Sequence, residues 1–339
     1  MKLVSTLSAA VAATALIAGA ASAQTTTLRI QTHQAPESAS GKEVKRFVEQ
    51  VETMSGGSLD IEMFYSSSIV ASAETFDAAA NGILDCDMTN GSYQTGKDAA
   101  FQFVADVMGG YDEPLQMLAW IQHGGGRQAI NDLYNDYGMQ FVGAYLGGAE
   151  SLNSTRPLDG IEDLKDFKFR SPPGMESEIF AELGATPIVM DFTEIFTALE
   201  TGIIDGADAS TLANNVGLGI YDIAKHTTYP GFHSMATDHL ACNKTVWDGL
   251  TDAQKEILKT AMDSTALRLM MRVLVENGEA VATLPKEKGV TLYDWSQEDR
   301  NAFREAAVAT WDRWAEKSPA AAKLVESHKA FIDRIGLGG

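Results

Sequence analysis

The sequence predicts an α/β protein of two similar lobes with a long helix that spans both. Three observations support this fold class. Strand and helix patterns alternate from residue 28 onward, the same order of elements recurs in the middle of the chain, and a helical apolar period runs from about residue 251 to 283. The chain of 339 residues is long enough for two hydrophobic cores. We expect lobe 1 in residues 24–150, with C-terminal segments that return to it, lobe 2 in 151–245, and in 246–339 a long spanning helix and C-terminal helices that pack on both lobes.

Residues 1–23 differ in composition from the rest of the chain. Lys2 precedes an apolar run over residues 9–18, and the small residues Ala21-Ser22-Ala23 follow. This order is typical of a cleaved secretory signal peptide. The apolar run is short and rich in Ala, whereas a membrane-spanning helix needs about 20 apolar residues. The sequence therefore predicts export to an extracytoplasmic compartment.

The charge balance restricts the class of partner. The chain has 46 Asp and Glu against 26 Lys and Arg, which gives a formal net charge of −20. Nucleic acids and anionic membranes are bound through a surplus of basic residues. Neither is expected as the main partner.

The first lobe begins with a strand, a helix and a second strand. Residues 28–32 and 59–64 are extended, and the amphipathic run 43–54 ends at Gly56-Gly57. Lobe 2 repeats this order with a strand at 167–170, a helix at 177–183 and a strand at 187–190.

A residue-level repeat supports two lobes of similar topology. Residues 74–85 and 194–205 share Glu, Phe, Ala, Gly, Ile and Asp at matching positions. In both segments a helix is predicted to end at the Gly, and a short apolar strand follows. A chance likeness between two helix-Gly-strand junctions is the simpler alternative.

Two facing α/β lobes form a cleft at the carboxyl ends of their strands. The polar side chains expected there are Gln31, His33, Asn90 and Tyr93 from lobe 1, and Arg170 and Asp208 from lobe 2. The segment 141–154 is extended and then rich in Gly, so it is predicted to cross between the lobes. Its Glu150 is expected near the hinge.

The long helix has a clear start. Thr251 and Gln254 have the spacing of a capping box. The row Met262, Leu267, Met270, Met271 and Leu274 is expected to pack in the interior rather than to line a ligand groove. Further helices are predicted at 297–317 and 320–335.

The two cysteines, Cys86 and Cys242, lie far apart in apolar, strand-like runs. An oxidising compartment permits a disulfide. We nevertheless expect two buried, unpaired thiols, because a free Cys behaves as a small hydrophobic residue.

Enzymatic motifs are weak. The sequence has no Gly-x-Ser-x-Gly and no His-Glu-x-x-His. The segment Gly124-Gly125-Gly126-Arg127 follows a helix and lacks the Lys-Ser/Thr of a phosphate loop, so we interpret it as a helix-terminating turn. A secreted hydrolase that uses two of the cleft acids is the remote alternative.

Arg170 is the most informative residue. A guanidinium at a strand end can bind a carboxylate through two parallel hydrogen bonds. The alternative is a structural ion pair with an acid such as Glu176. Glu150 and Asp208 could pair with Arg170, hydrogen-bond ligand hydroxyls or an ammonium, or coordinate a hard cation such as Na⁺ or Ca²⁺.

The segments 161–172, 183–187 and 195–206 resemble the substrate-binding proteins of tripartite ATP-independent periplasmic (TRAP) transporters, the DctP-like family. The resemblance implies a periplasmic-binding-protein fold, hinge closure on a small organic acid and delivery to TRAP membrane permease subunits. It also implies that Arg170 binds the ligand carboxylate. A homodimer is compatible with it, and so is a sensory rather than a transport role.

Several segments, among them 91–97 and 229–231, look most like the branch that binds 2-oxo and 2-hydroxy monocarboxylates together with a cation. On this basis His233 joins the candidate ligand residues, and Glu150 and Asp208 are the candidate metal ligands. The branch usually has Trp after the acid, where this chain has Ala209. A larger sugar acid or a zwitterionic acid is therefore the alternative ligand class.

Overall fold

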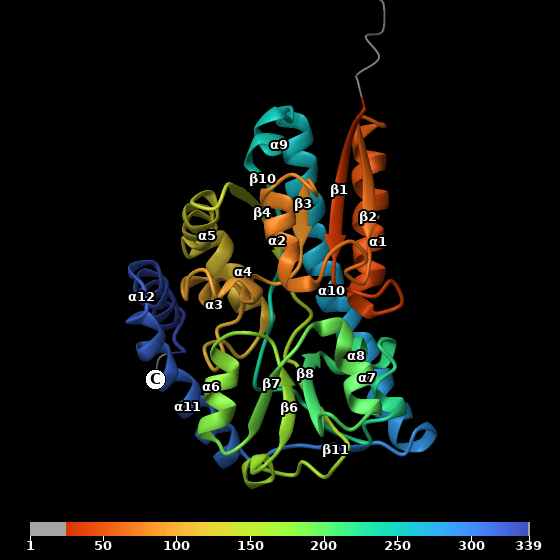
Figure 1. The fold of residues 1–339 in the computed structure, drawn as a ribbon, viewed down its shortest axis with the longest axis vertical. Helices are drawn as coiled ribbons and strands as arrows, with labels where there is room; N and C mark the ends of the chain where they lie inside the picture. Colours follow the sequence, from red (N-terminus) through yellow and green to blue (C-terminus); the bar gives the residue numbers. More distant parts are fainter. Residues whose placement is uncertain (1–24, 338–339) are drawn as a thin grey trace, which may run out of the picture.

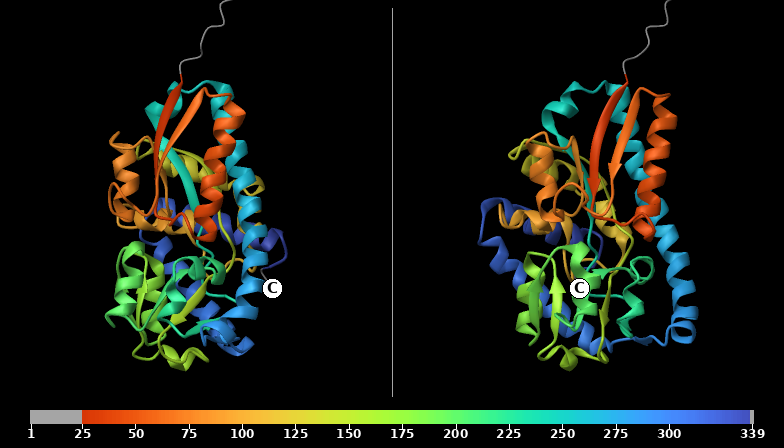
Figure 2. Two further views of the ribbon diagram at one scale, coloured as in Figure 1. Left: turned by 90° about the vertical axis from the view of Figure 1, so that its right-hand side faces the viewer. Right: turned by 45° about the vertical axis from the view of Figure 1, so that its right-hand side comes forward.

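The computed structural model describes residues 25–337, so the predicted signal peptide lies outside the described residues (Figure 1). Two sheets lie one above the other in Figures 1 and 2, each with helices on its faces. The two-lobed α/β architecture is confirmed. No helix within residues 25–337 combines the length and apolar character needed to cross a membrane.

The first sheet has the strand order β2-β1-β3-β10-β4. Its strands are β1 (Thr26–Thr32), β2 (Leu59–Phe64), β3 (Cys86–Met88), β4 (Met139–Tyr145) and β10 (Asp238–Asn243). Strand β10 pairs antiparallel with β3 and β4. The boundary of lobe 2 expected at residue 245 is therefore wrong, because β10 already belongs to the first sheet.

The second sheet has the order β11-β9-β5-β8-β6-β7. Its strands are β5 (Ser151–Ser154), β6 (Lys168–Ser171), β7 (Thr186–Val189), β8 (Gly206–Ser210), β9 (His226–Thr228) and β11 (Thr291–Tyr293).

The two sheets repeat one topology. The pair β1 and β2 is parallel, and so is the pair β6 and β7. In each sheet the third strand, β3 or β8, pairs in parallel with the first strand, β1 or β6. On its other side it pairs with an antiparallel strand that has crossed over from the other lobe, β10 in the first sheet and β5 in the second. The agreement in strand order supports the sequence repeat. The chain crosses between the sheets from β4 to β5 and returns from β9 to β10.

Short helices connect these strands. In lobe 1 they are α1 (Ala39–Ser55), α2 (Thr75–Ala80), α3 (Ala100–Ala105), α4 (Pro114–His123), α5 (Gly126–Asn135) and α9 (Lys244–Gly249). In lobe 2 they are α6 (Met175–Glu182), α7 (Ile195–Glu200) and α8 (Leu212–Gly217). The turn between α4 and α5 contains Gly125 at φ 90°, which confirms the helix-terminating turn.

Helix α10 (Asp252–Glu287) has 36 residues, or about 54 Å at 1.5 Å per residue. It packs on α1 and β4 of the first lobe and on α8 and β11 of the second. The predicted capping box is present at Thr251 and Gln254. Helices α11 (Gln297–Ala315) and α12 (Pro319–Arg334) pack on α6 and on α3, respectively.

The prediction that the Met-rich row of α10 packs in the interior is wrong for three of its residues. Leu267 is 52% exposed, Met271 60% and Leu274 76%. The buried side of α10 instead follows Leu258, Met262, Ala266, Leu269 and Val273, which recur every three to four residues. The row therefore straddles two faces, and only Met262 is fully buried.

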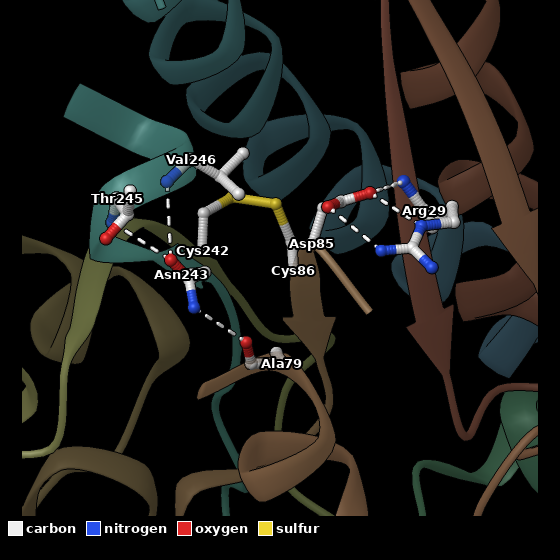
Figure 3. The surroundings of a disulfide bond; sticks show 8 residues. All are labelled: Arg29, Ala79, Asp85, Cys86, Cys242, Asn243, Thr245 and Val246. Carbon is white, nitrogen blue, oxygen red and sulfur yellow. Dashed lines mark hydrogen bonds and ion pairs between the residues drawn. A yellow bond between two sulfur atoms is a disulfide. The ribbon is translucent and has the colours of Figure 1, made fainter. Parts of the chain in front are cut away.

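The expectation of two free thiols is also wrong, because Cys86 and Cys242 form a disulfide (Figure 3). Cys86 on β3 and Cys242 on β10 are direct cross-strand partners. Their separation of 156 residues in sequence concealed this pairing. The bridge ties β10, the strand that returns from lobe 2, to β3 in the middle of the first sheet.

We expect the double substitution of Cys86 and Cys242 by Ser to lower the free energy of unfolding by about 2–5 kcal/mol, because the closed loop is long. Thermal denaturation measures the effect. A reducing agent should lower the midpoint of the wild type but not that of the double variant. An unchanged midpoint in both proteins would contradict the prediction.

Candidate functional site

A partly open cavity of about 50 Å³ lies between the lobes. Its walls come from the carboxyl ends of strands, from the crossover that follows β4, and from the N-terminal end of α6. Residues that follow β3 (Asn90, Ser92, Tyr93) and residues at the end of β8 (Asp208, Ala209, Ser210) line this same cavity. The prediction that these two strand ends face one another is confirmed.

The structure brings six of the eight predicted site residues to this cavity. They are Arg170, Glu150, Asp208, Tyr93, Asn90 and His33. Gln31 does not line it, because its amide is hydrogen-bonded to Val70 and Thr75 beside β1. His233 lies behind Asp208 and also does not line it.

Arg170 is 2% exposed at the end of β6. Its Nη1 donates to the carbonyl oxygen of Asp208 at 2.9 Å, and its Nε donates to that of Met190 at 3.2 Å. In the described part of the chain, Nη2 has no hydrogen-bond partner and no carboxylate forms an ion pair with Arg170. The structural ion pair with Glu176 considered above is therefore not formed. Two hydrogen bonds therefore fix the position of the guanidinium, and its Nη2 is left without a partner among the described residues.

Glu150, Asp208 and His233 form a compact cluster, in which one potential ligand atom from each residue lies within 4.8 Å of the others. The Nε2 atom of His233 is 2.8 Å from Oδ1 of Asp208. Although burial raises the pKa of Asp208, its hydrogen bond with His233 brings it below the ordinary value. Burial and the neighbouring Asp208 raise the pKa of Glu150 well above its ordinary value. The carboxylate oxygens of Glu150 and Asp208 are the kind of ligand that a hard cation prefers, whereas the imidazole of His233 is not and is paired with Asp208.

Two further acids reach this region that sequence reasoning had not placed in the site. Asp106 follows α3, and Glu176 lies in the first turn of α6; both line the cavity. The hydroxyl of Ser234 is 2.6 Å from Asp106 and 2.8 Å from Glu150. A hydroxyl has one proton, so both contacts are hydrogen bonds only when one of these carboxyl groups is protonated. Burial raises the pKa of Asp106 to about 6 despite the Ser234 hydrogen bond.

The lobe 1 wall of the cavity is already internally paired. The Nε2 atom of His33 lies 3.2 Å from the Asp238 carboxylate, which also accepts hydrogen bonds from Gln34 and Asn90. The His33 ring packs against Tyr93 and Phe192 at centroid distances of 5.7 and 4.9 Å. This wall therefore offers a ligand aromatic rings and the hydroxyl of Tyr93. The charged side chains without an ion-pair partner among the described residues lie on the lobe 2 wall and near the hinge.

Three sets of direct contacts hold the lobes together around the cavity. The Asp191 carboxylate accepts hydrogen bonds from the backbone N–H and the hydroxyl of Ser72, at 2.7 and 2.8 Å. The Gln102 side chain accepts from the backbone N–H of Met175 at 2.9 Å, and Asn214 accepts from that of Ser40 at 3.0 Å. The structure is therefore a closed arrangement.

A cavity between two α/β lobes, lined by a buried arginine, is typical of a solute-binding protein. The particular family follows from comparison. Residues 30–318 match the model of the bacterial extracellular solute-binding proteins, family 7 (DctP). The chain belongs to this family, the periplasmic solute-binding proteins of TRAP transporters.

Individual relatives agree with this assignment. The monocarboxylate 2-oxoacid-binding periplasmic protein of a Nostoc species is 29% identical over 84% of this chain and 78% of its own length. A TRAP solute-binding protein of Rhodobacter sphaeroides, solved in an apo open state, is 34% identical, with a TM-score of 0.72 over 92% of this chain and 99% of that one. A TRAP protein of Pseudoalteromonas atlantica with bound sodium and pyruvate is 26% identical and reaches 0.81 over 92% and 95%. The higher score against the liganded protein agrees with the closed arrangement.

We expect Asp191→Ala to shift the ligand-free protein toward an open arrangement. A hydrogen bond to a charged group contributes about 1.5–3 kcal/mol, so the equilibrium ratio of closed to open protein should fall roughly ten-fold or more. Small-angle X-ray scattering measures this as a larger radius of gyration. Ser72→Ala removes only one of the two bonds and should have a smaller effect. Equal radii for the three proteins would contradict the prediction.

Proposed function

We propose that this protein captures a small organic monocarboxylate in the periplasm and delivers it to the membrane permease subunits of a TRAP transporter. The observation that carries the proposal is the buried guanidinium of Arg170, which lines the cavity and whose Nη2 has no hydrogen-bond partner within residues 25–337. An unpaired buried donor favours a ligand that accepts from it. A carboxylate matches the flat edge of a guanidinium.

The size of the cavity favours small acids within this class. One water molecule takes up about 10–15 Å³ of cavity volume measured in this way. A cavity of about 50 Å³ therefore has room for only a few non-hydrogen atoms. This suits 2-oxo and 2-hydroxy acids of the size of pyruvate or lactate. A larger sugar acid would require the closed lobes to separate. Ala209 leaves space beside Asp208, but Glu176 and Asp106 occupy the same cavity.

We further propose that a hard cation, Na⁺ or Ca²⁺, binds with the ligand at the carboxylates of Glu150 and Asp208. Five acids (Asp106, Glu150, Glu176, Asp208 and Asp238) and one Arg line the cavity, and an anionic ligand would add another negative charge. A cation between the ligand and the two carboxylates would offset this repulsion. The Pseudoalteromonas relative, with its sodium and pyruvate, supports the proposal by analogy.

We expect the protein to release its ligand without any chemical change to it. Incubation with candidate acids, esters and glycosides, followed by mass spectrometry, should detect no product. A turnover product would favour the hydrolase alternative. Uptake of the labelled acid by cells that contain the permease, with and without this protein, distinguishes transport from a purely sensory role.

We expect Arg170→Lys to lower the affinity for the carboxylate by at least about ten-fold, because Lys retains the charge but loses the paired donors. Isothermal titration calorimetry measures the affinity. A thermal melt without ligand checks that the variant is folded. Affinity close to that of the wild type would remove Arg170 as the anchor.

We expect ligand affinity to depend on the cation. A chelator combined with replacement of Na⁺ by a bulky organic cation should weaken binding about ten-fold or more, and Ca²⁺ or Na⁺ should restore it. Glu150→Gln should reduce this dependence, because it removes one anionic ligand. Affinity that does not change without either ion would reject the cation site.

A further inference from the structure

The outward side of helix α10 has a row of exposed, uncharged residues, which we call the outer row. Helix α10 runs along the outside of both lobes, with α1 beside it (Figure 2). The outer row consists of Leu267, Met271, Leu274, Val275, Gly278, Ala282 and Pro285. Its four large side chains are 52–76% exposed. The row recurs every three or four residues, so it forms one face of the helix. A continuous apolar face on a soluble protein indicates a contact site for another molecule.

Gly278 is the member of the outer row that the fold itself does not explain. It lies inside α10, and glycine is the least favourable residue in a helix interior apart from proline. A Cβ added at Gly278 would meet no atom within 4 Å, so the packing of the described chain does not require a glycine here. Glycine permits another backbone to approach closely. A second helix that lies against the outer row would therefore account for it.

Helix α1 widens this face. Two shallow hollows of about 390 and 300 Å³ lie between α1 and α10. Met54 lines the first, Met271 and Val275 line the second, and Arg46 and Arg268 line both. A stable interface buries about 1,200–2,000 Å² in total, which requires more than a single row of side chains. The contact face therefore includes the side of α1 that borders the outer row.

The charges beside the outer row are arranged so that two copies of α10 complement each other. Arg268 and Glu279 are eleven residues apart, or about three turns, so they lie on the same flank of the row. In an antiparallel pair about a two-fold axis between residues 273 and 274, Glu279 of each copy lies opposite Arg268 of the other. Arg268 is already paired with Glu43, but Arg46 lines the same hollows and its side chain is 58% exposed. Glu279 is exposed as well. Each copy thus offers an available cation and an available anion at matching positions.

We propose that the outer row of α10 is a dimer interface, on which a second copy of this chain binds through antiparallel pairing of the two α10 helices. Leu274, the most exposed member, lies beside the two-fold axis. Gly278 of each copy lies opposite Leu267 and Met271 of the other. Within the described part of α10, the residue that lines the ligand cavity is Leu269, on the buried side of the helix. The pairing therefore does not compete with the ligand, and the inference does not depend on which ligand is bound.

Sedimentation velocity of the purified protein over a range of concentrations tests the proposal. We expect the wild type to form a dimer that dissociates on dilution. Leu274→Glu places two like charges beside the axis and should weaken association about ten-fold or more. Val189→Glu is the matched control. Val189 is 55% exposed on β7, at the opposite edge of the second sheet from β11, on which α10 packs. This control should associate as the wild type does.

Two further sets of variants test the details of the pairing. Arg46→Glu and Glu279→Arg should each weaken the dimer, and the double variant should recover it, because the charges are exchanged across the axis. Gly278→Gln should separate a closer helix packing from a general loss of stability. Gln is the better helix former, so the thermal midpoint of the diluted protein should not fall, whereas the dimer should weaken because the side chain keeps the helices apart.

Several outcomes would overturn the inference. A wild type that stays monomeric at the highest soluble concentration rejects the interface. A dimer that tolerates Leu274→Glu rejects it too, because its contact must then lie on another face. A double variant of Arg46 and Glu279 that fails to recover association rejects the antiparallel pairing. Thermal melts of the diluted variants confirm that each is folded, and none of these outcomes affects the proposed function.

Discussion

The structure depends on how a group of buried carboxylates is compensated between the lobes. Asp106, Glu150, Glu176 and Asp208 share one cavity with the single guanidinium of Arg170. Isolated buried charges are costly, so each acid needs a proton, a donor or a cation. Ser234 links two of them, His233 serves the third, and the fourth has no partner among the described residues. The chain's own side chains therefore leave this site incomplete in charge and in hydrogen bonding, which supports the proposed capture of an organic acid together with a cation.

Much of the fold could be predicted because its signals are local. Glycine at helix ends, apolar strand runs and the capping box at Thr251 depend on residues close together in sequence. The positions of Arg170 and Asp208 followed from one rule, that ligands lie at the carboxyl ends of strands. The same rule misplaced Gln31, because a side chain at a strand end can turn toward its own lobe. Here Gln31 binds the loop before α2.

The failures share a different cause: each needs contacts between distant segments. Whether Cys86 meets Cys242 depends on a strand order that brings β10 back beside β3. Asp106 directly follows a helix, and Glu176 lies in the first turn of another. The residues beside Glu176 do not mark it as buried. For Asp106 the weak signal was an acid directly after the fully apolar end of a helix. For Leu267 and Leu274, apolar character predicted burial, but the helix is covered on one side only.

The return of β10 to the first sheet also governs the order in which the chain can be completed. Strand β10 fills the gap between β3 and β4, yet it is encoded after all of the second lobe except β11. As the chain emerges from its amino end, the first sheet has two unpaired edges at β3 and β4 until residue 243 is available. Unpaired strand edges invite association with other chains. The first sheet can therefore be completed, and its disulfide closed, only after most of the second lobe has been synthesised.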